Sequence, residues 1–510
     1  MKKMKKVMAL ALSFMMVVAM SVAAFAGSTA GSSTYTITAP AGTDHTYGIY
    51  QIFTGDLYGT TLSNLKWGAN SKRAENVKIG DDVDDSVIAA LTVAKSAVND
   101  TAKLDVIEKY VDLDSAPVVT ISDKAVYSAK AGYYLIKDNA SLTGKDEAYT
   151  KYIVAVVGDL TITPKSVKPS VDKQVQDEVA DAEEGADLEG WGESADHAIN
   201  ESFKFKLIAT LPASTHYIDY PKYAVKFTDK MSAGVTFESI ESVTVDGMSV
   251  DAKGYKCSAT AGQAGGDWTL FIADLKTISG VDLTDGAEVV VVYNAHLNEK
   301  ATVNHTTGTT DNKNTVSLEY SNNPNVGGEG DMGKTKEDHV WVFTYEVDNT
   351  KVDQNKDPLP GAGFRLYKGT NTSNEVELIY DDTLKAYRPV KGSEVAQEMT
   401  SADTTGKFNI VGLDAGTYTL VETTTPAGYN TCASITITIE ATHKEAVTGD
   451  SATTTIDNEK STMTNEVINM SGSTLPTTGG MGTTIFYVVG SILVLGAAIL
   501  LITKKRMSAR

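Results

Sequence analysis

Short segments of alternating apolar and polar residues recur through the middle of the chain, and this rhythm constrains the fold strongly. Alternation with a period of two places successive side chains on opposite faces of a β-strand. The segments are Phe203–Leu207, Tyr223–Phe227, Ser242–Val245, Trp268–Ile272, Val289–Tyr293 and Thr315–Tyr320. Turn residues such as Asp246-Gly247 and Asp285-Gly286 separate them. The pattern predicts a β-sandwich.

The same rhythm on both sides of this region predicts three domains in series. Residues 27–165 contain strand-like segments and, from Asp84 to Val111, an apolar spacing that suits one or two amphipathic helices. Residues 166–335 contain the segments above, and residues 336–470 contain a further set from Val340 to Ile439. We therefore expect an all-β rod of tandem immunoglobulin-like sandwiches, with a helical insertion in the first domain.

Both ends of the chain carry apolar segments with basic flanks. Four lysines precede an apolar run and then Ala24-Phe25-Ala26, which predicts a secretory signal peptide over residues 1–26. Residues 471–510 contain an apolar run from Ile485 to Thr503, long enough to cross a bilayer, with a basic tail that should remain cytoplasmic. The pentapeptide before this run is Leu475, Pro476, Thr477, Thr478 and Gly479. We interpret this order as a cleavage signal for a sortase transpeptidase; the alternative is a simple membrane anchor.

Composition excludes several classes of function. The formal net charge is −20, and it becomes −28 when the four basic residues at each end are removed. So acidic a surface disfavours a nucleic-acid partner. No His or Cys cluster has metal-ligand spacing and no Gly-rich phosphate loop occurs, so no metal or cofactor site is predicted. The two cysteines, Cys257 and Cys432, fall in different predicted domains, so an intradomain disulfide is not expected.

Three polar residues of the second domain share a strand face with apolar neighbours. Lys173, Asp229 and Asn314 each lie an even number of residues from apolar residues, on the strand face that the pattern places in the core. The neighbours are Val171 and Val175 for Lys173, Val225, Phe227 and Met231 for Asp229, and Val316, Leu318 and Tyr320 for Asn314.

The third domain repeats this arrangement with Lys351, Glu422 and Asn469. The neighbours on the same face are Tyr345 and Val347 for Lys351, Tyr418 and Leu420 for Glu422, and Val467 for Asn469. In both domains a lysine lies near the first strand, an acid in the middle and an asparagine near the last strand. The alternatives are chance and a buried ion pair, and desolvation makes a buried ion pair costly.

Such a trio favours a covalent reaction. A lysine desolvated among apolar side chains tends to be neutral and nucleophilic, and an acid in the same place stays protonated and can polarise a carbonyl. The amine can then attack the carboxamide, release ammonia and leave a Lys–Asn isopeptide bond, helped by roughly 7–11 kcal/mol from fixed proximity. We predict Asp229 and Glu422 as the catalytic acids. The predicted cross-links join Lys173 to Asn314 and Lys351 to Asn469.

Several longer stretches resemble the major (backbone) pilins of Gram-positive bacteria that carry a Leu-Pro-x-Thr-Gly anchor. The stretches are residues 45–55, 66–68, 131–136, 227–234, 320–324, 359–364, 418–423 and 426–429. The segment around Glu422 is similar to the E-box of pilins, and the third domain resembles a Cna-B-type fold. On this resemblance both trios fall on isopeptide positions. No comparable trio stands out in the first domain, so none is predicted there.

The resemblance implies a lysine that is joined to the next subunit, usually within Tyr-Pro-Lys between the first two domains. Tyr220-Pro221-Lys222 is the literal match but lies inside the second domain. Thr163-Pro164-Lys165 lies at the domain boundary, with Thr in place of Tyr. There Leu160 and Ile162 take one strand face and Lys165 the other, and Pro164 keeps the edge open. We favour Lys165 as the acceptor, with Lys222 as the alternative.

The favoured hypothesis is a structural subunit of a sortase-assembled pilus shaft on the cell surface, linked from Thr478 to Lys165 of the next subunit. The resemblance implies as partners a class C pilus sortase, a housekeeping sortase, accessory pilins, peptidoglycan and other copies of this chain. The alternative is a monomeric adhesin anchored to the cell wall. An enzyme is disfavoured because the reactive trios face inward and are consumed once.

Overall fold

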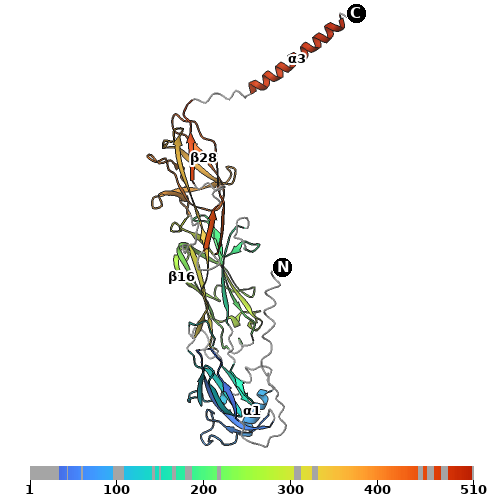
Figure 1. The fold of residues 1–510 in the computed structure, drawn as a ribbon, viewed down its shortest axis with the longest axis vertical. Coiled ribbons are helices and arrows are strands. Elements are labelled where there is room, and N and C mark those ends of the chain that lie inside the picture. The colour runs from blue at the N-terminus through green and yellow to red at the C-terminus, as the bar shows by residue number, and fades with distance from the viewer. Residues whose placement is uncertain are drawn as a thin grey trace.

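The protein is described from a computed structural model that places three lobes end to end and a helix beyond the last lobe (Figure 1). The lobes comprise residues 34–162 (first lobe), 168–343 (middle lobe) and 345–469 (third lobe). The structure describes residues 34–42, 44–58, 61–95, 108–140, 144–148, 151–162, 168–178, 186–214, 217, 220–303, 312–323, 331–445, 452–456, 464–472 and 481–507. The predicted signal peptide, residues 1–26, lies outside them.

The first lobe contains two mainly antiparallel sheets that enclose a core around Tyr134 and Ile136. The smaller sheet has the order β5-β1-β8, with β1 Thr34–Thr38, β5 Val126–Lys130 and β8 Leu160–Thr161. The larger has the order β3-β2-β6-β7 with β4 on β2: β2 Thr46–Tyr58, β3 Thr61–Trp67, β4 Val119–Ser122, β6 Gly132–Asp138 and β7 Lys151–Val156.

The predicted helical insertion is present in the first lobe as α1, Asp85–Lys95, and a short 3-10 turn, Glu108–Tyr110. Val87 of α1 is buried and Leu91 packs on the same cluster, whereas Ile88 is exposed. The helix thus covers the core with one face, as its apolar spacing predicted.

The middle lobe is a single hydrogen-bonded set of strands folded around the largest core of the protein. Its main path is β10-β9-β12-β17-β13-β18-β20-β11. The bounds are β9 Ser170–Gln176, β10 Trp191–Gly192, β11 Ser194–Asp196, β12 Ser202–Leu211, β13 Val225–Val245, β14 Met248–Ser249, β15 Lys256–Cys257, β16 Ala264–Ile272, β17 Ala287–Leu297, β18 Lys313–Ser321, β19 Met332–Lys334 and β20 Asp338–Phe343. Two 3-10 turns, Leu275–Thr277 and Leu283–Asp285, lie between β16 and β17.

Strand β13 joins two segments that the sequence analysis treated as separate strands. Its first part, from Val225 to Met231, pairs with β16 on one side and β18 on the other, and its second part pairs with β17. Between these two parts the strand continues through a register shift, from Met231 to Thr236, and does not form a turn. Gly234 lies there, and a Cβ at this position would come within 2.7 Å of Ala301 Cα.

The third lobe packs two five-stranded sheets, β24-β25-β27-β21-β32 and β23-β22-β28-β29 with β26 on β22, around Tyr345, Phe364 and Ile410. The bounds are β21 Tyr345–Asp353, β22 Gly363–Lys368, β23 Glu375–Val376, β24 Leu378–Asp381, β25 Ala386–Pro389, β26 Met399–Thr400, β27 Ile410–Leu413, β28 Gly416–Thr424, β29 Ile435–Ile439, β30 Ala441–Glu445, β31 Ala452–Ile456 and β32 Thr464–Asn469. Strands β30 and β31 form a separate two-stranded ribbon. The predicted all-β architecture is confirmed.

The segment Val340 to Val347, read from the sequence as one strand of the third domain, is divided in the structure. Strand β20 pairs with β18 and, in parallel, with β11, so it belongs to the sheet of the middle lobe. Its faces serve two cores: Val340 and Val342 pack in the middle lobe, and Trp341 and Phe343 in the third. Alternation shows which residues share a face of a strand. It does not reveal that one face is covered by one domain and the other face by the next domain.

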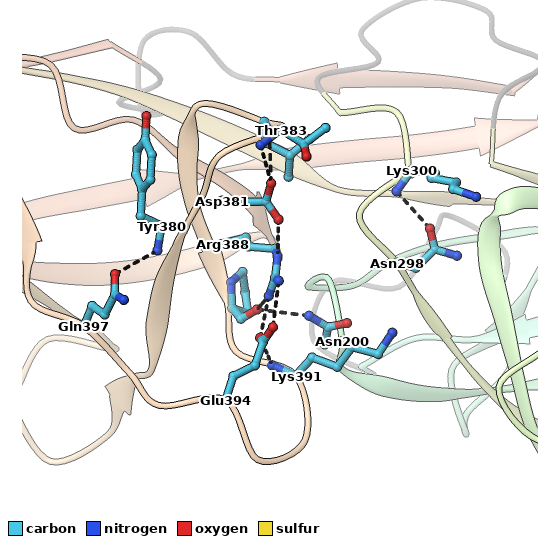
Figure 2. Close-up of polar contacts among 12 residues, drawn as sticks. Asn200, Asn298, Lys300, Tyr380, Asp381, Thr383, Arg388, Lys391, Glu394 and Gln397 are labelled. Atoms are coloured by element: carbon cyan, nitrogen blue, oxygen red, sulfur yellow. Dashed lines mark hydrogen bonds and ion pairs between the residues drawn. The ribbon is translucent and has the colours of Figure 1, made fainter.

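A polar cluster reinforces the junction between the middle and third lobes (Figure 2). Arg388 donates from Nε to Asp381 Oδ2 at 2.9 Å and from its terminal nitrogens to Glu394 at 2.8 and 3.0 Å. The carbonyl of Pro389 accepts from Asn200 Nδ2 at 3.0 Å. The ion pairs hold the end of β25 in place while Asn200 of the middle lobe binds it.

The helix α3, Met481–Met507, extends beyond the third lobe (Figure 1). Its segment Tyr487–Lys505 has a mean hydropathy of 2.1 and none of it is buried against the protein. By length and composition this helix can cross a membrane.

Candidate functional site

The middle lobe brings Lys173, Asp229 and Asn314 together in its interior, and all three side chains are fully buried. Lys173 Nζ donates a hydrogen bond to Asp229 Oδ2. Its main-chain nitrogen donates to Asp338 Oδ2 at 2.6 Å. Of the trio predicted from strand parity, Lys173 and Asp229 are therefore in direct contact.

Three strands position this trio. Lys173 lies on β9, opposite Leu207 of β12. Asp229 lies on β13, and Asn314 lies on β18 opposite Met231 of β13. Since Asp229 and Met231 are two residues apart, Asp229 and Asn314 lie diagonally on the same face of the paired strands.

Burial shifts both ionisable groups of the middle trio toward their neutral forms. Desolvation lowers the pKa of Lys173, although Asp229 opposes this shift. Desolvation raises the pKa of Asp229, although Lys173 opposes it. Both shifts oppose the charged forms, because charge is costly in this apolar site. A neutral amine has the free electron pair that attack on a carboxamide requires.

A tyrosine that the sequence analysis did not select completes the middle cluster. The hydroxyl of Tyr293 donates to Asp229 Oδ2 at 3.1 Å and accepts from Lys173 Nζ at 3.2 Å and from Asn314 Nδ2 at 2.7 Å. Tyr293 lies on β17, on the same strand face as buried Val289 and Val291. The alternation along this strand predicts that Tyr293 faces the core. Tyrosines are common in protein cores, so this position alone does not identify Tyr293 as a functional residue.

The third lobe assembles its acid and asparagine directly. Asn469 Nδ2 donates to Glu422 Oε1 at 2.6 Å, and the main-chain nitrogen of Cys432 donates to Glu422 Oε2 at 2.7 Å. Lys351, Glu422 and Asn469 are buried, with Glu422 6 % exposed. These two hydrogen bonds hold the carboxyl group of Glu422 against Asn469.

Lys351 lies beside this pair on the adjacent strand. Strands β21 and β32 run parallel, with Lys351 opposite Val467 and Asp353 opposite Asn469. Lys351 Nζ donates to the carbonyls of Val352 at 2.9 Å and Val467 at 3.0 Å. Burial lowers the pKa of Lys351. Lys351 and Asn469 thus arise from neighbouring strands, with the amine bound to main-chain carbonyls.

The residues predicted to join subunits lie mostly outside the described part of the chain. This holds for Lys165 and for Leu475, Pro476, Thr477, Thr478 and Gly479. Just before Lys165, Thr161 is exposed and Ile162 is buried, consistent with the predicted strand faces. The alternative acceptor Lys222 is exposed, between buried Tyr220 and Tyr223.

Other reactive groups are few in the described residues. Cys257 and Cys432 are free and half-buried, and burial raises the pKa of Cys432 to about 11. No group of His, Cys, Asp or Glu within the described ranges is arranged to hold a metal.

Comparison with known proteins gives a family match in the third lobe and relatives along most of the chain. Residues 346–453 match the SpaA family, described as a prealbumin-like fold domain. The trypsin-resistant surface T6 protein of Streptococcus pyogenes serotype M6 is 26% identical over 359 residues, which is 64% of this chain and 58% of that protein. The chain thus matches less than two thirds of that relative's length. The resemblance to Gram-positive major pilins is confirmed.

Solved pilin structures align with much of the chain. The T6 backbone pilin of S. pyogenes serotype M6 is 20% identical, with a TM-score of 0.47 over 88% of this chain and 100% of that one. SpaD, the major pilin of Corynebacterium diphtheriae, is 16% identical, with a TM-score of 0.42 over 87% of this chain and 98% of SpaD. BcpA, the major pilin subunit of Bacillus cereus, is 14% identical, with a TM-score of 0.42 over 86% and 99%.

Proposed function

We propose that this chain is a structural subunit of a covalent pilus shaft, stabilised by two internal Lys–Asn isopeptide bonds. The observation that carries the proposal is the pair of buried lysine, acid and asparagine trios, one in each of two consecutive lobes. Buried charged groups are expensive, so a chain that buries two lysines needs a reason to keep them. Conversion to amides removes both ionisable amines.

Each bond would join strands that lie far apart in sequence. In the middle lobe the bond would join β9 to β18, and in the third lobe β21 to β32. Each closes a loop of more than about 100 residues, which a disulfide model associates with a stabilisation of about 5 kcal/mol. An amide also withstands reduction, which suits an exported chain with two free cysteines.

Polymerisation would use the predicted signal before α3. A sortase cysteine would cleave the Thr478–Gly479 bond and hold Thr478 as a thioester. Lys165 of another subunit would then attack the thioester, freeing the cysteine and forming a Thr478–Lys165 amide. This head-to-tail contact does not close on itself, so repetition yields a fibre.

The joint is tested by expressing the full chain with a class C pilus sortase and resolving cell-wall extracts on denaturing gels. We expect a ladder of high-mass species for the wild type and its loss in Lys165→Ala. Lys222→Ala is the matched control and should retain the ladder. Loss of the ladder in Lys222→Ala alone would make Lys222 the acceptor, and no ladder in the wild type would favour the monomeric adhesin.

The internal bonds are tested independently by intact-mass measurement of the purified chain. The wild type should be lighter than its sequence mass by two molecules of ammonia, after allowance for removal of the signal peptide. An unshifted mass would refute both bonds. Peptide mapping then assigns each loss to Lys173–Asn314 or Lys351–Asn469.

A further inference from the structure

The hydroxyl of Tyr293 occupies the centre of the middle cluster, within hydrogen-bond distance of every reacting group. It lies 3.2 Å from the attacking Lys173 Nζ, 3.1 Å from Asp229 Oδ2 and 2.7 Å from the departing Asn314 Nδ2. A phenol both donates and accepts, so it can receive one proton as it releases another. We propose that Tyr293 is a catalytic residue of the middle lobe that carries the proton from Asp229 to the leaving nitrogen of Asn314; this rests on the proposed isopeptide bond.

The need for this relay follows from the leaving group. An amide nitrogen departs as ammonia only after it gains a proton, since its anion is a very poor leaving group. Asp229 is the acid of the cluster, and in the structure it contacts the amine and the phenol. Asn314 Nδ2 instead donates to the phenol oxygen. The phenol therefore bridges the acid and the nitrogen that must be protonated.

The proposed step balances in atoms and electrons. The electron pair of Lys173 Nζ forms a bond to Cγ of Asn314. In the structure the hydroxyl of Tyr293 donates to Asp229 Oδ2 and accepts from Nδ2, so the transfer needs both hydrogen bonds to reverse once attack has made Nδ2 basic. Tyr293 then gives its proton to Nδ2 and takes the carboxyl proton of Asp229, while Asp229 takes a proton from Nζ. The bond from Cγ to Nδ2 then breaks, and ammonia leaves with the electron pair. Tyr293 and Asp229 end in the states in which they began.

The third lobe explains why only one lobe requires a tyrosine. There the acid is a glutamate, one methylene longer, and Glu422 Oε1 accepts directly from Asn469 Nδ2 at 2.6 Å. In the middle lobe the acid is the shorter aspartate, and the Tyr293 hydroxyl spans the difference. Aspartate with tyrosine in one lobe thus occupies the role of glutamate in the other.

The environment of Tyr293 suits a fixed relay. Its ring packs against Phe205, Phe237 and Trp268, with ring centres 5.2, 5.6 and 5.0 Å away. Burial also raises the pKa of its hydroxyl well above the usual value, so the phenol keeps its proton until the reaction needs it. The packing of these three rings holds the oxygen in place.

The test compares Tyr293→Phe with wild type by following bond formation in the full chain after brief induction. Peptide mapping measures each cross-link separately, so Lys351–Asn469 is an internal control within every molecule. We expect Tyr293→Phe to form the Lys173–Asn314 bond about 100-fold or more slowly, the lower range for proton transfer by a positioned side chain. The third-lobe bond should form at the wild-type rate.

Tyr223→Phe is the matched control, because Tyr223 is a fully buried tyrosine of the same core outside the trio. It should form both bonds normally. A ring-fluorinated tyrosine at position 293 restores the hydroxyl and should restore the rate, which separates proton transfer from a folding defect.

Formation of Lys173–Asn314 at the wild-type rate in Tyr293→Phe would overturn the role of Tyr293 while leaving the proposed bond intact. Failure of the fluorinated tyrosine to restore the rate would also overturn it. Absence of the Lys173–Asn314 bond from the wild type would refute the bond itself, and the relay with it.

Discussion

At the scale of single residues, the middle cluster shows how burial changes the properties of polar side chains. Lys173, Asp229 and Asn314 would be poor core residues if judged by polarity alone. Enclosed together, the amine has a lowered pKa and the acid a raised pKa, and the Tyr293 hydroxyl connects them to the carboxamide. In water the lysine and the aspartate would both be ionised, and a protonated amine does not attack a carboxamide.

The substitution Asn314→Ala removes the group that Lys173 would attack. We expect the middle cross-link to be absent and the free energy of unfolding of this lobe to fall by about 5 kcal/mol, the value for opening a covalent loop of this length. Calorimetry of the full chain with mass measurement checks this result. Asn294→Ala, on β17 outside the trio, should change neither the mass nor the transition by a comparable amount; an equal loss there would contradict the prediction.

A carboxyl pair at the junction between the middle and third lobes predicts a pH dependence. Asp196 accepts hydrogen bonds from the Tyr345 hydroxyl at 3.0 Å and from the nitrogen of Ala415 at 3.2 Å. Burial, with Asp196 beside it, raises the pKa of Asp414 to about 10, although Lys368 lies 3.2 Å away and opposes the shift. Asp414 therefore remains protonated at neutral pH.

An acid whose pKa rises on folding binds more protons in the folded state. The free energy of unfolding should therefore fall as the pH rises from about 4, the unfolded value, toward 10. Asp414→Asn removes this titration. The free energy of unfolding of the variant should therefore fall less than that of the wild type between pH 5 and pH 9. Denaturant titrations at several pH values measure the difference. Asp382→Asn, an exposed carboxyl of the same lobe, should follow the wild type.

At the scale of secondary-structure elements, β20 couples two domains because its faces belong to two cores. Trp341 is fully buried in the third lobe, while Val340 and Val342 of the same strand pack in the middle lobe. The backbone of β20 is held by β18 and β11. Loss of packing on one face therefore loosens a strand that the other lobe also uses.

We expect Trp341→Ala to destabilise the chain by about 3–5 kcal/mol, the usual range for emptying a core tryptophan site. Amide hydrogen exchange should accelerate in β18 of the middle lobe as well as in β22 of the third lobe. Phe364→Ala is the control, since Phe364 packs only in the core of the third lobe. Unchanged exchange in β18 of Trp341→Ala would show that the lobes unfold independently.

At the scale of the whole molecule, three lobes in series and a terminal helix form an extended chain (Figure 1). Load applied along this axis would pass through the strands that the proposed bonds join. Residues between Lys173 and Asn314, and between Lys351 and Asn469, would then be shielded from extension. The chain would behave as a stiff element under load, as a shaft requires.

Single-molecule pulling tests this shielding directly. The wild type should not release the chain enclosed by either bond, whereas Asn314→Ala should gain a contour length of roughly 480 Å, at about 3.4 Å for each of the approximately 141 residues released. Asn469→Ala should gain a smaller length from the third lobe. Release of the full enclosed length by the wild type would contradict the covalent closure of both lobes.

Local pattern was sufficient to predict several features of this protein. Alternation with period two predicted the all-β architecture, and it placed Lys173, Asp229 and Asn314 among core residues, where the structure finds them. The apolar spacing around Val87 predicted α1, and the run after Ile485 predicted α3. These inferences succeeded because side-chain direction along a strand or helix follows from backbone geometry alone.

Tertiary structure decided what alternation leaves open. It joined two predicted strands into β13 and divided the segment from Val340 to Val347 between two sheets. It also brought Tyr293 from β17 to the centre of the cluster. Strand pairing and the meeting of opposite faces depend on contacts between residues far apart in the chain, and the parity of one segment contains no information about which segment will face it.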